Sequence, residues 1–350
     1  MPEARAGAPL RVGVIGVGAI TIAYHLPSLA SIPGARVVAV ADPLPAARER
    51  ARRMTDAAMH ADADELLSRG DLDAVVIAAS SHLHADLATA AARSGLHAYL
   101  EKPVAIDAAG ADRVRRAVDE AGTIAVVGFN RRMHPLYRQA RRLIARGRIG
   151  RLVCVQSIFS EPTTLATMPD WKRRRASGGG VLLDLASHHI DQIRWLAGDE
   201  ITRVSARCAS DLSEQDGAWL DVELADGATA QCAFSFRGGY ADHVELYGER
   251  GTLRVDRHRS SLIMTLPRRV GYGRRIGRPL PTRELVLWRA RRSIRRGEPS
   301  YAAALAAFVA QARGGPAAAA SLDDGLRSLA VVLAAEESAG LGRPVACGSS

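Results

Sequence analysis

The sequence predicts an α/β protein with an N-terminal Rossmann domain, built on a doubly wound parallel sheet, and a C-terminal α+β domain with a mainly antiparallel open sheet. Its 350 residues exceed the roughly 250–300 residues at which one hydrophobic core stops growing. In the first third, short apolar segments alternate with helical patterns, which is typical of βαβ units. After residue 150, strand-like segments follow one another directly. We therefore expect domains at residues 8–129 and 130–345.

The first domain shows five short apolar strands separated by helical patterns. The strands are expected at residues 10–15, 36–41, 74–79, 97–100 and 124–128. A helix that includes Leu26 and Leu29 follows the first strand, and a helix over 83–94 follows the third. Because each strand–helix–strand unit pairs its strands in parallel, helices should cover both faces of this sheet.

The second domain has a different rhythm. Strands are expected at residues 151–160, 201–208, 218–225, 228–236, 242–248, 251–256 and 261–266, and helices at 181–197, 300–313 and 322–339. Asp226-Gly227 separates two of the strands and favours a tight hairpin in which both turn residues have positive φ. Consecutive strands joined by tight turns predict the mainly antiparallel sheet.

The composition narrows the class of protein. The hydrophobic fraction of 47% and the charged fraction of 24% are ordinary for a globular protein. No apolar run approaches the roughly 20 residues of a membrane span, and the first nine residues do not resemble a secretory signal. The four cysteines form no C-x-x-C pair, so we expect reduced thiols and no metal site. We expect a cytoplasmic protein that does not bind a membrane.

The net charge of +10 is concentrated in one segment. Eleven arginines lie between Arg268 and Arg296, and only Glu284 opposes them. This segment is either a solvated insertion or a surface for an anionic ligand or partner. No recognition motif and no interleaved aromatic residues accompany the charge, so we expect no nucleic-acid binding.

A glycine-rich turn after the first strand indicates a dinucleotide site. In Gly16-Val17-Gly18-Ala19-Ile20-Thr21, the first glycine permits a tight turn, and the second lets a pyrophosphate approach the backbone amides and the helix dipole. We expect the cofactor at Gly16, Gly18, Ala19 and Ile20. Thr21 stands where the motif has Gly or Ala, and we expect it to loosen the contact between helix and strand. The alternative is an ordinary glycine-rich turn.

Asp42 ends the second strand, at the distance from the glycines where an acid bonds the ribose 2′-hydroxyl. A carboxylate repels a 2′-phosphate, so the cofactor is expected to be NAD rather than NADP. Arg48 lies nearby on the next helix, and its positive charge would instead favour the 2′-phosphate of NADP. The alternative role of Asp42 is a helix cap before Pro43.

Glu101-Lys102-Pro103 follows the fourth strand. Ligands of open parallel sheets bind outside the carboxyl ends of the strands, so Lys102 there can approach both a nicotinamide and a substrate hydroxyl. The alternative is a solvent-facing strand end.

A second polar group follows Gly178-Gly179-Gly180, which we expect to form a flexible approach to a helix. Asp184 and His188 are four residues apart and therefore share one helix face, together with Asp191 and Trp195. We interpret Asp184 and His188 as catalytic. The alternatives are a buried structural hydrogen bond and a metal site that lacks a third ligand. His189 points elsewhere, and we assign it no role.

With these motifs together, the sequence resembles the Gfo/Idh/MocA family of glucose–fructose oxidoreductase and inositol dehydrogenase relatives, over residues 10–266 and 300–345. The resemblance is carried by the Gly16/Gly18 turn, Asp42, His82-Leu83-His84, Glu101-Lys102-Pro103, Gly128-Phe129-Asn130-Arg131-Arg132, Gly178-Gly179-Gly180 with Asp184 and His188, and Tyr247-Gly248-Glu249-Arg250-Gly251-Thr252-Leu253. Two features depart from the family. Ala79-Ser80-Ser81 replaces its usual Thr-Pro-Asn, and segment 267–297 has no counterpart.

The resemblance implies that Lys102 and His188 act at the hydride-transfer centre with Asp184 beside them. It also implies a cis Lys102–Pro103 bond and an oligomerisation role for the C-terminal sheet, hence a homo-oligomer, either dimer or tetramer. Further cofactor contacts are expected from Ser80, Ser81, His84, Glu101 and Asn130. Arg132, Trp171 and Lys172 are candidate contacts to substrate hydroxyls or to an anionic group.

The expected reaction is the reversible oxidation of a secondary hydroxyl on a sugar, aminosugar or cyclitol, with hydride transfer to NAD. His188 is expected to be the general base, Asp184 to orient its imidazole, and Lys102 to stabilise the alkoxide or to act as the base itself. Alternatives are a redox-assisted glycosidase that uses NAD, a sugar-sensing regulator without catalysis, and a reductase of a non-sugar substrate.

Overall fold

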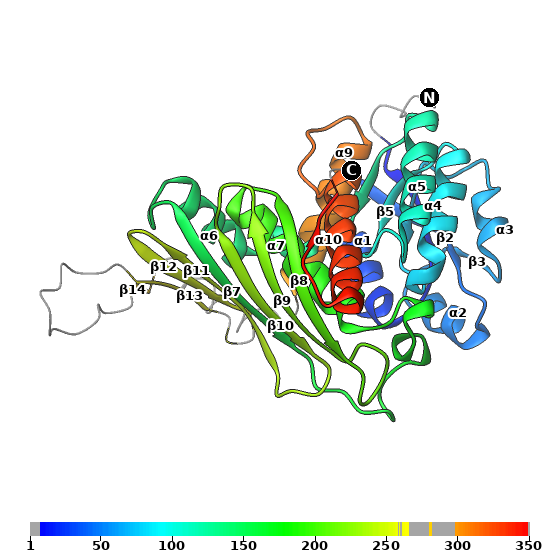
Figure 1. Ribbon diagram of the computed structural model, residues 1–350. Coiled ribbons are helices and arrows are strands. Elements are labelled where there is room, and N and C mark those ends of the chain that lie inside the picture. The colour runs from blue at the N-terminus through cyan, green and yellow to red at the C-terminus, as the bar shows by residue number, and fades with distance from the viewer. Residues whose placement is uncertain (1–7, 258, 260, 266–279, 282–297, 349–350) are drawn as a thin grey trace, which may run out of the picture. The chain divides into compact units, whose positions relative to one another are not determined.

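Figure 1 shows the computed structural model of the chain, which describes residues 8–257, 259, 261–265, 280–281 and 298–348. The chain forms two compact units. The first comprises Met1–Met133, Ala176–Gly178 and Glu298–Leu329, and the second comprises His134–Arg175, Gly179–Gly297 and Ala330–Ser350. A single cut at residue 130 does not reproduce this division, because Glu298–Leu329 returns to the first unit.

The first unit contains a six-stranded parallel sheet in the order β3-β2-β1-β4-β5-β6. Its strands are β1 (Leu10–Ile15), β2 (Ala35–Ala41), β3 (Ala58–His60), β4 (Ala74–Ile77), β5 (His97–Leu100) and β6 (Ala125–Val127). The strand order reverses between β1 and β4, which is the switch point where doubly wound sheets bind ligands. The Rossmann prediction is confirmed, although the sequence did not indicate β3.

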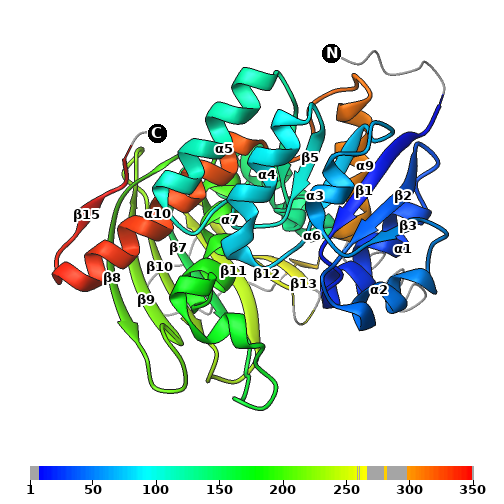
Figure 2. The same cartoon turned by 90° about the vertical axis from the view of Figure 1, so that its right-hand side faces the viewer.

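Helical segments cover this sheet. They are η1 (Thr21–His25), α1 (Leu26–Ala30), α2 (Pro45–Arg52), α3 (Ala63–Leu67), η2 (Ser81–Leu83), α4 (His84–Arg93), α5 (Ala108–Ala121), η3 (Asn130–Met133) and α9 (Pro299–Ala312). Helices α4 and α5 lie side by side (Figure 2). Helix α9 joins the core of the first unit, where Phe308 packs with Val12, Val76 and Tyr99. Its apolar face therefore explains why the chain returns to this unit.

The second unit contains a nine-stranded sheet in the order β14-β13-β12-β11-β7-β10-β9-β8-β15. Its strands are β7 (Leu152–Ser160), β8 (Ile201–Ala209), β9 (Gly217–Leu224), β10 (Thr229–Ser235), β11 (Ala241–Gly248), β12 (Gly251–Asp256), β13 (Ser261–Thr265), β14 (Leu280–Pro281) and β15 (Val345–Ala346). Only β7 and β10 pair in parallel. The mainly antiparallel prediction is confirmed.

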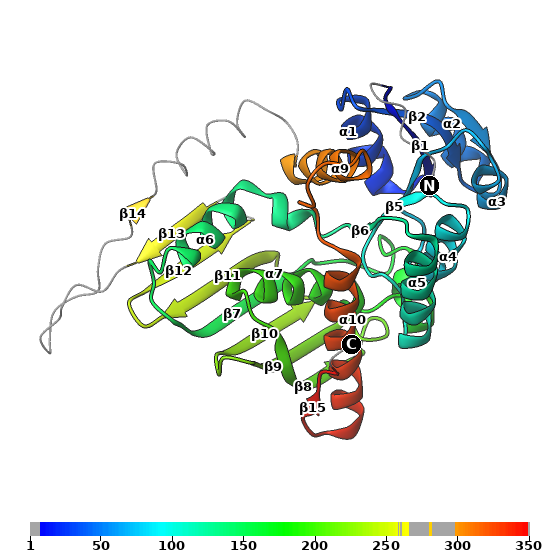
Figure 3. The same cartoon turned by 90° about the horizontal axis from the view of Figure 1, so that it is seen from above.

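One face of this sheet is covered and the other is open. The helical segments are α6 (Pro135–Ala145), η4 (Asp170–Arg173), η5 (Arg175–Ser177), η6 (Leu182–Ala186), α7 (Ser187–Ala197) and α10 (Leu322–Leu341). Helices α6 and α7 lie together on one side of the sheet (Figure 3). Residues of β9 alternate strictly, so that Trp219, Asp221 and Glu223 are exposed on the other side. We call that side the open face.

The Asp226-Gly227 hairpin differs from its prediction. It joins β9 to β10, but only Gly227 has positive φ (+87°), and Asp226 does not. The Gly227 amide donates to the Leu224 carbonyl (3.1 Å), and the Leu224 amide donates to the Ala228 carbonyl (2.9 Å). This pattern is a three-residue loop with its glycine in the left-handed region, so the expected two-residue turn was wrong.

Two further observations concern the whole chain. No helix in the described residues is long and apolar enough to cross a membrane. Most of the arginine-rich segment 267–297 lies outside the described residues.

Candidate active site

The glycine turn of the first unit has the shape that the motif requires. Gly16 has φ +90°, and a Cβ there would lie 2.6 Å from the Ala78 carbonyl oxygen, so only glycine fits. A Cβ on Gly18 would meet nothing within 4 Å, and Ala19 and Ile20 beside it are exposed. The backbone at Gly18 therefore borders open space, which fits the approach of a pyrophosphate.

Thr21 does not loosen the turn, so that expectation was wrong. Thr21 is fully buried, and its hydroxyl donates to the Gly16 carbonyl at 2.7 Å. It stands at the start of η1, a π-helical turn, rather than in a regular α-helix. This hydrogen bond holds the start of η1 against the glycine turn. In the usual motif, close packing of a glycine or alanine holds the two together.

Asp42 anchors the same turn. One carboxylate oxygen accepts the Val17 amide at 2.8 Å, and the other accepts the Leu44 amide at 2.9 Å. Each oxygen keeps a lone pair for a further donor, so the capping role and a ribose contact are compatible. The Arg48 guanidinium donates to the carbonyl oxygens of Asp42 (2.6 Å) and Pro43 (3.0 Å). Arg48, the residue that favoured NADP in the sequence, is therefore already hydrogen-bonded to the backbone.

The loop after β4 is held by a buried histidine. His84 Nδ1 lies 2.6 Å from the Pro103 carbonyl oxygen, and its Nε2 lies 3.0 Å from that of Ala79. Burial lowers the pKa of His84 despite these two acceptors. His84 thus joins the loops after β4 and β5 and supports Ser80. Ser81 is buried against Gly178 (φ +85°), where a Cβ would come within 2.5 Å of it.

The Glu101-Lys102-Pro103 segment rests on a contact between Glu101 and a buried histidine that sequence reasoning missed. Glu101 Oε1 lies 3.0 Å from Nε2 of the fully buried His25, and a Cβ on Gly128 would come within 2.9 Å of the Glu101 carboxyl carbon. Glu101 is therefore fixed behind Lys102, which is half-buried. The Lys102–Pro103 bond is cis, as the family resemblance implied.

Two predicted contacts of the first unit are engaged elsewhere. Asn130 is buried, and its side-chain amide donates to the Ser300 hydroxyl of α9 at 2.8 Å. Arg132 pairs with Asp324 at 3.0 Å. Burial opposes the Asp324 carboxylate, but Arg132 keeps the pKa of Asp324 below its ordinary value. The charge of Arg132 is thus balanced within this unit.

In the second unit, Asp184 and His188 share one accessible stripe. The expected helix over 181–197 is divided into the π-helical turn η6 and helix α7. Across 181–194 every side chain is buried except those of Asp184 and His188. Asp191 is buried, and Trp195 is half-buried. A π-helical turn inside a helix is frequently associated with a functional site.

Lys172 lies directly against Asp184. Its Nζ is 2.7 Å from Asp184 Oδ2, and it also lies over the ring of Trp171 at 5.6 Å from the centroid. The glycine run makes this approach possible. A Cβ on Gly179 would come within 2.3 Å of the Lys172 carbonyl oxygen. The glycines therefore serve close packing rather than the flexibility we expected.

Within the described residues, no group of three or more His, Cys, Asp or Glu side chains is arranged to hold a metal ion. All four cysteines are free thiols.

Comparison with known proteins decides the family. Residues 10–129 match the oxidoreductase family with an NAD-binding Rossmann fold, and residues 137–254 match the GFO/IDH/MocA C-terminal domain. Over 338 residues the chain is 30% identical to inositol 2-dehydrogenase of Rhizobium meliloti (strain 1021), covering 94% of this chain and 96% of that protein. The chain belongs to the Gfo/Idh/MocA family.

Other similar proteins agree. Myo-inositol 2-dehydrogenase of Thermotoga maritima is 27% identical over 342 residues, which cover 94% of this chain and 96% of that protein. A levoglucosan dehydrogenase in complex with NADH and levoglucosan superposes with a TM-score of 0.85 at 25% identity, covering 97% of this chain and 100% of that one. This member of the Gfo/Idh/MocA family is an NAD(P)-dependent oxidoreductase that acts on CH–OH groups.

His189, to which the sequence assigned no role, is the centre of a buried network in this Gfo/Idh/MocA protein. Its Nδ1 lies 2.5 Å from the Ser157 hydroxyl, and its Nε2 lies 3.1 Å from Asp242 Oδ1. Arg257 completes the network at 3.0 Å from Asp242 Oδ2, and the Phe159 ring stacks on the imidazole at 5.2 Å. The network fixes α7, and with it His188, to β7 and β11. No linear spacing signals it, because its members are far apart in sequence.

Proposed function

We propose that this protein reversibly oxidises a secondary hydroxyl of a neutral sugar, aminosugar or cyclitol, with hydride transfer to NAD. The observation that carries the proposal is the pair Asp184 and His188, the only accessible side chains along residues 181–194 of an otherwise buried helix. A carboxylate and an imidazole presented together are suited to proton transfer near neutral pH.

NAD would be held by the first unit. The amides around Gly18, Ala19 and Ile20 would face the pyrophosphate, and Asp42 would accept from the ribose hydroxyls. Ser80 and Ser81 follow the next strand and would border the same edge of the sheet. When bound, the nicotinamide supplies the hydride acceptor. NAD is favoured over NADP because Asp42 is a carboxylate, while backbone carbonyls engage Arg48.

His188 would take the proton of the substrate hydroxyl, with Asp184 orienting the imidazole and stabilising its protonated form. Lys102 would stabilise negative charge that develops on a substrate oxygen, a role that the family motif implies. These roles rest on the chemistry of each side chain and on the family motifs that carry them.

The pairing of cations favours a neutral substrate. Arg132 pairs with Asp324, Lys172 with Asp184, and Arg175 with Glu336. An arginine or lysine already paired with a carboxylate gives little extra attraction to a sugar acid. The names of the similar proteins, inositol 2-dehydrogenase and scyllo-inositol 2-dehydrogenase (NAD(+)), also point to polyols.

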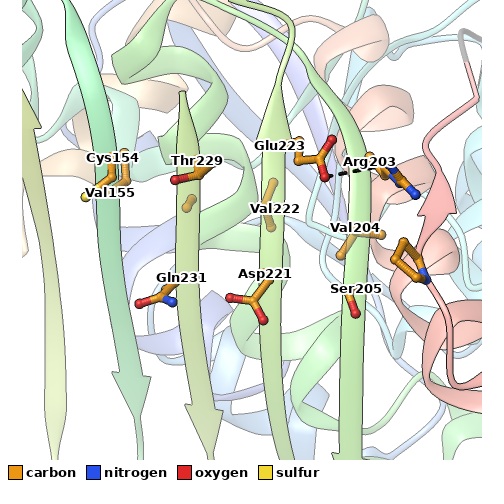
Figure 4. A pocket seen from close by; sticks show the side chains of 12 residues that line it. Cys154, Val155, Arg203, Val204, Ser205, Asp221, Val222, Glu223, Thr229 and Gln231 are labelled. Atoms are coloured by element: carbon orange, nitrogen blue, oxygen red, sulfur yellow. Dashed lines mark ion pairs between the residues drawn. The ribbon is translucent and has the colours of Figure 1, made fainter. Parts of the chain in front are cut away.

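The open face supports a homo-oligomer, either dimer or tetramer. Trp219 is 44% exposed and Ile158 is 37% exposed on this face. Figure 4 shows side chains that line a hollow on it, where Glu223 points to Arg203 at 3.8 Å and Asp221 and Gln231 stand on neighbouring strands. The hollow has a volume of about 440 Å³. A face that carries both acids and an arginine can pair with a copy of itself. Light scattering of wild-type protein and of Trp219→Arg would test this, and an unchanged mass would contradict it.

The deciding experiment has two steps. Purified protein is titrated with NAD and with NADP by calorimetry, and NADH absorbance is then followed with a panel of inositols, neutral sugars, aminosugars, sugar acids and nucleotide sugars. Preferential NAD binding with NADH formed from a neutral polyol would support the proposal. Glycoside cleavage without net NADH would indicate the redox-assisted glycosidase, and NAD binding without turnover of any compound would indicate the sugar-sensing regulator.

A further inference from the structure

The side chain of Lys172 is fixed by an ion pair and by two aromatic rings, which is more than a residue at the rim of a substrate site requires. Its Nζ lies 2.7 Å from Asp184 Oδ2, and only 25% of its side chain and 12% of the Asp184 side chain are exposed. Two aromatic rings flank the ammonium, with centroids 5.6 Å away in Trp171 and 5.8 Å away in Phe236. Such rings favour a cation over their faces, so the ammonium has partners on several sides.

The backbone that carries Lys172 is fixed as well. The Gly179 amide donates to the Arg174 carbonyl at 3.0 Å, and the Glu214 amide donates to that of Arg173 at 3.1 Å. Glu214 also accepts the Arg175 amide at 2.6 Å. The nearby Gly179 and the distant Glu214 thus both hold the loop that presents Lys172.

The loop over residues 211–216, which contains Glu214, has an unusual backbone conformation. Gln215 has φ +51°, a left-handed conformation that is uncommon for a residue with a side chain. Its carbonyl accepts the Val181 amide at 2.8 Å, next to the start of η6. The fully buried Asp216 closes the loop by accepting the amides of Asp211 (3.0 Å) and Ser213 (3.1 Å). The loop that holds Lys172 from one side therefore also holds the helix that carries Asp184.

The electrostatics agree with a permanent ion pair. Burial disfavours the ammonium, but the charge and hydrogen bond of Asp184, with the charge of Glu161, raise the pKa of Lys172 above its ordinary value. Among the described groups, the carboxylates that act on the Lys172 ammonium are those of Asp184 and of Glu161, which directly follows β7.

We propose that Lys172 is a positioning residue that fixes Asp184 as an oriented carboxylate for the catalytic histidine, and is not a contact to the substrate. The inference rests on the proposed function in one respect, namely that Asp184 and His188 carry the proton transfer. One Asp184 oxygen is committed to Lys172. The other oxygen is then the acceptor that can orient an imidazole, and the ammonium 2.7 Å away favours the ionised form of the carboxyl.

The test compares Lys172→Met with Lys172→Arg, using the substrate found in the screen. Methionine keeps the length and apolar contacts of the stem but has no charge, so kcat should fall about 10²-fold while KM changes less than about threefold. The acid limb of the pH profile should move up by about one pH unit, because the carboxyl has lost its cation. Arginine keeps the charge and should restore most of kcat. Arg174→Met removes an exposed charge from the same loop, and its kcat and pH profile should remain those of the wild type.

A double-mutant cycle separates this inference from the proposed function. If Lys172 acts through Asp184, Lys172→Met should add little to the loss caused by Asp184→Asn alone. Independent, multiplying losses would overturn the inference, as would a raised KM with an unchanged pH profile. Full turnover in Asp184→Asn or His188→Ala would instead refute the proposed function.

A measurement without substrate tests the ion pair itself. The difference in unfolding free energy between wild type and Lys172→Met should be present at pH 7 and should shrink as the pH falls far enough to protonate Asp184. A difference that stays constant from neutral to acid pH would show that the pair is not formed and would overturn the inference.

Discussion

The candidate site residues of the two units are held in different ways. In the first unit, backbone groups hold the residues around the glycine turn and the loop after β4. Asp42 accepts two amides, His84 lies between two carbonyl oxygens, and Thr21 donates to a carbonyl. In the second unit, side chains hold side chains, as in Lys172 with Asp184 and His189 with Asp242. A site built on the backbone keeps its shape when a neighbouring side chain changes. A site built on side-chain pairs fails when one partner is lost.

The largest expected effect is on turnover, and it separates loss of catalysis from loss of NAD binding. His188→Ala or Lys102→Ala should lower turnover at least ~10²-fold, because each removes a proton-transfer or alkoxide-stabilising group. NAD affinity should remain largely unchanged, since the glycine turn and Asp42 are intact. Steady-state kinetics with NAD calorimetry check both parts. Wild-type turnover in either variant would refute its catalytic assignment.

The buried network should show how strongly the second unit depends on side-chain pairs. Asp242→Ala leaves His189 and Arg257 without their carboxylate in a fully buried place, so unfolding free energy should fall by about 3 kcal/mol. Asp112→Ala, which removes an exposed carboxylate of α5, is the control and should change it by less than about 0.5 kcal/mol. Denaturant unfolding measures both. Equal effects would mean that the network does not hold α7.

The glycine turn allows the sharpest contrast within the first unit. Gly16→Ala should destabilise the protein by about 1–3 kcal/mol, because φ is +90° and the Cβ meets backbone at 2.6 Å. Gly18→Ala should leave stability unchanged, since nothing lies within 4 Å, but should weaken NAD binding about tenfold by occupying space for the pyrophosphate. Equal NAD affinity in Gly18→Ala and wild type would place the cofactor elsewhere.

Asp42→Ala should narrow the preference for NAD over NADP about tenfold, because the carboxylate that repels a 2′-phosphate is lost. The Asp42→Asn variant keeps a side-chain acceptor for the Val17 amide and removes only the charge, which separates the capping role from cofactor selection. Parallel titrations with both nucleotides measure the ratio. An unchanged ratio in both variants would leave Asp42 only its capping role.

The smallest expected effect concerns the Arg132–Asp324 pair. The folded-state pKa of Asp324 is lowered from its usual 3.8, so the pair contributes stability above that pH and loses it as the pH falls through the folded-state value. Asp324→Asn should therefore lower the melting temperature at pH 7 and much less at pH 2–3. A difference independent of pH would mean that the carboxylate charge is not what stabilises this contact.

Much of the first unit could be predicted from the sequence because its signals are local. The short apolar strands, Gly16 and Asp42 each report on backbone that is close in sequence, and β1 runs from Leu10 to Ile15 as expected. The strand expected over 218–225 is likewise present as β9, Gly217–Leu224. Thr21 shows the limit, because a motif position does not reveal that a hydroxyl will bond to Gly16.

Contacts between distant segments could be decided only by the tertiary structure. The apolar residues of α9 can be read from the sequence. Only folding brings the rings of Phe308 and Tyr99 together, with their centroids 5.9 Å apart. His25 with Glu101, Lys172 with Asp184 and His189 with Asp242 join residues separated by 76, 12 and 53 positions. The sequence by itself determined the fold class and predicted which residues carry the chemistry, because periodicity and turn geometry are local properties of the chain. The partner, charge balance and accessibility of each of those residues depend on how distant segments pack, and therefore belong to the tertiary structure alone.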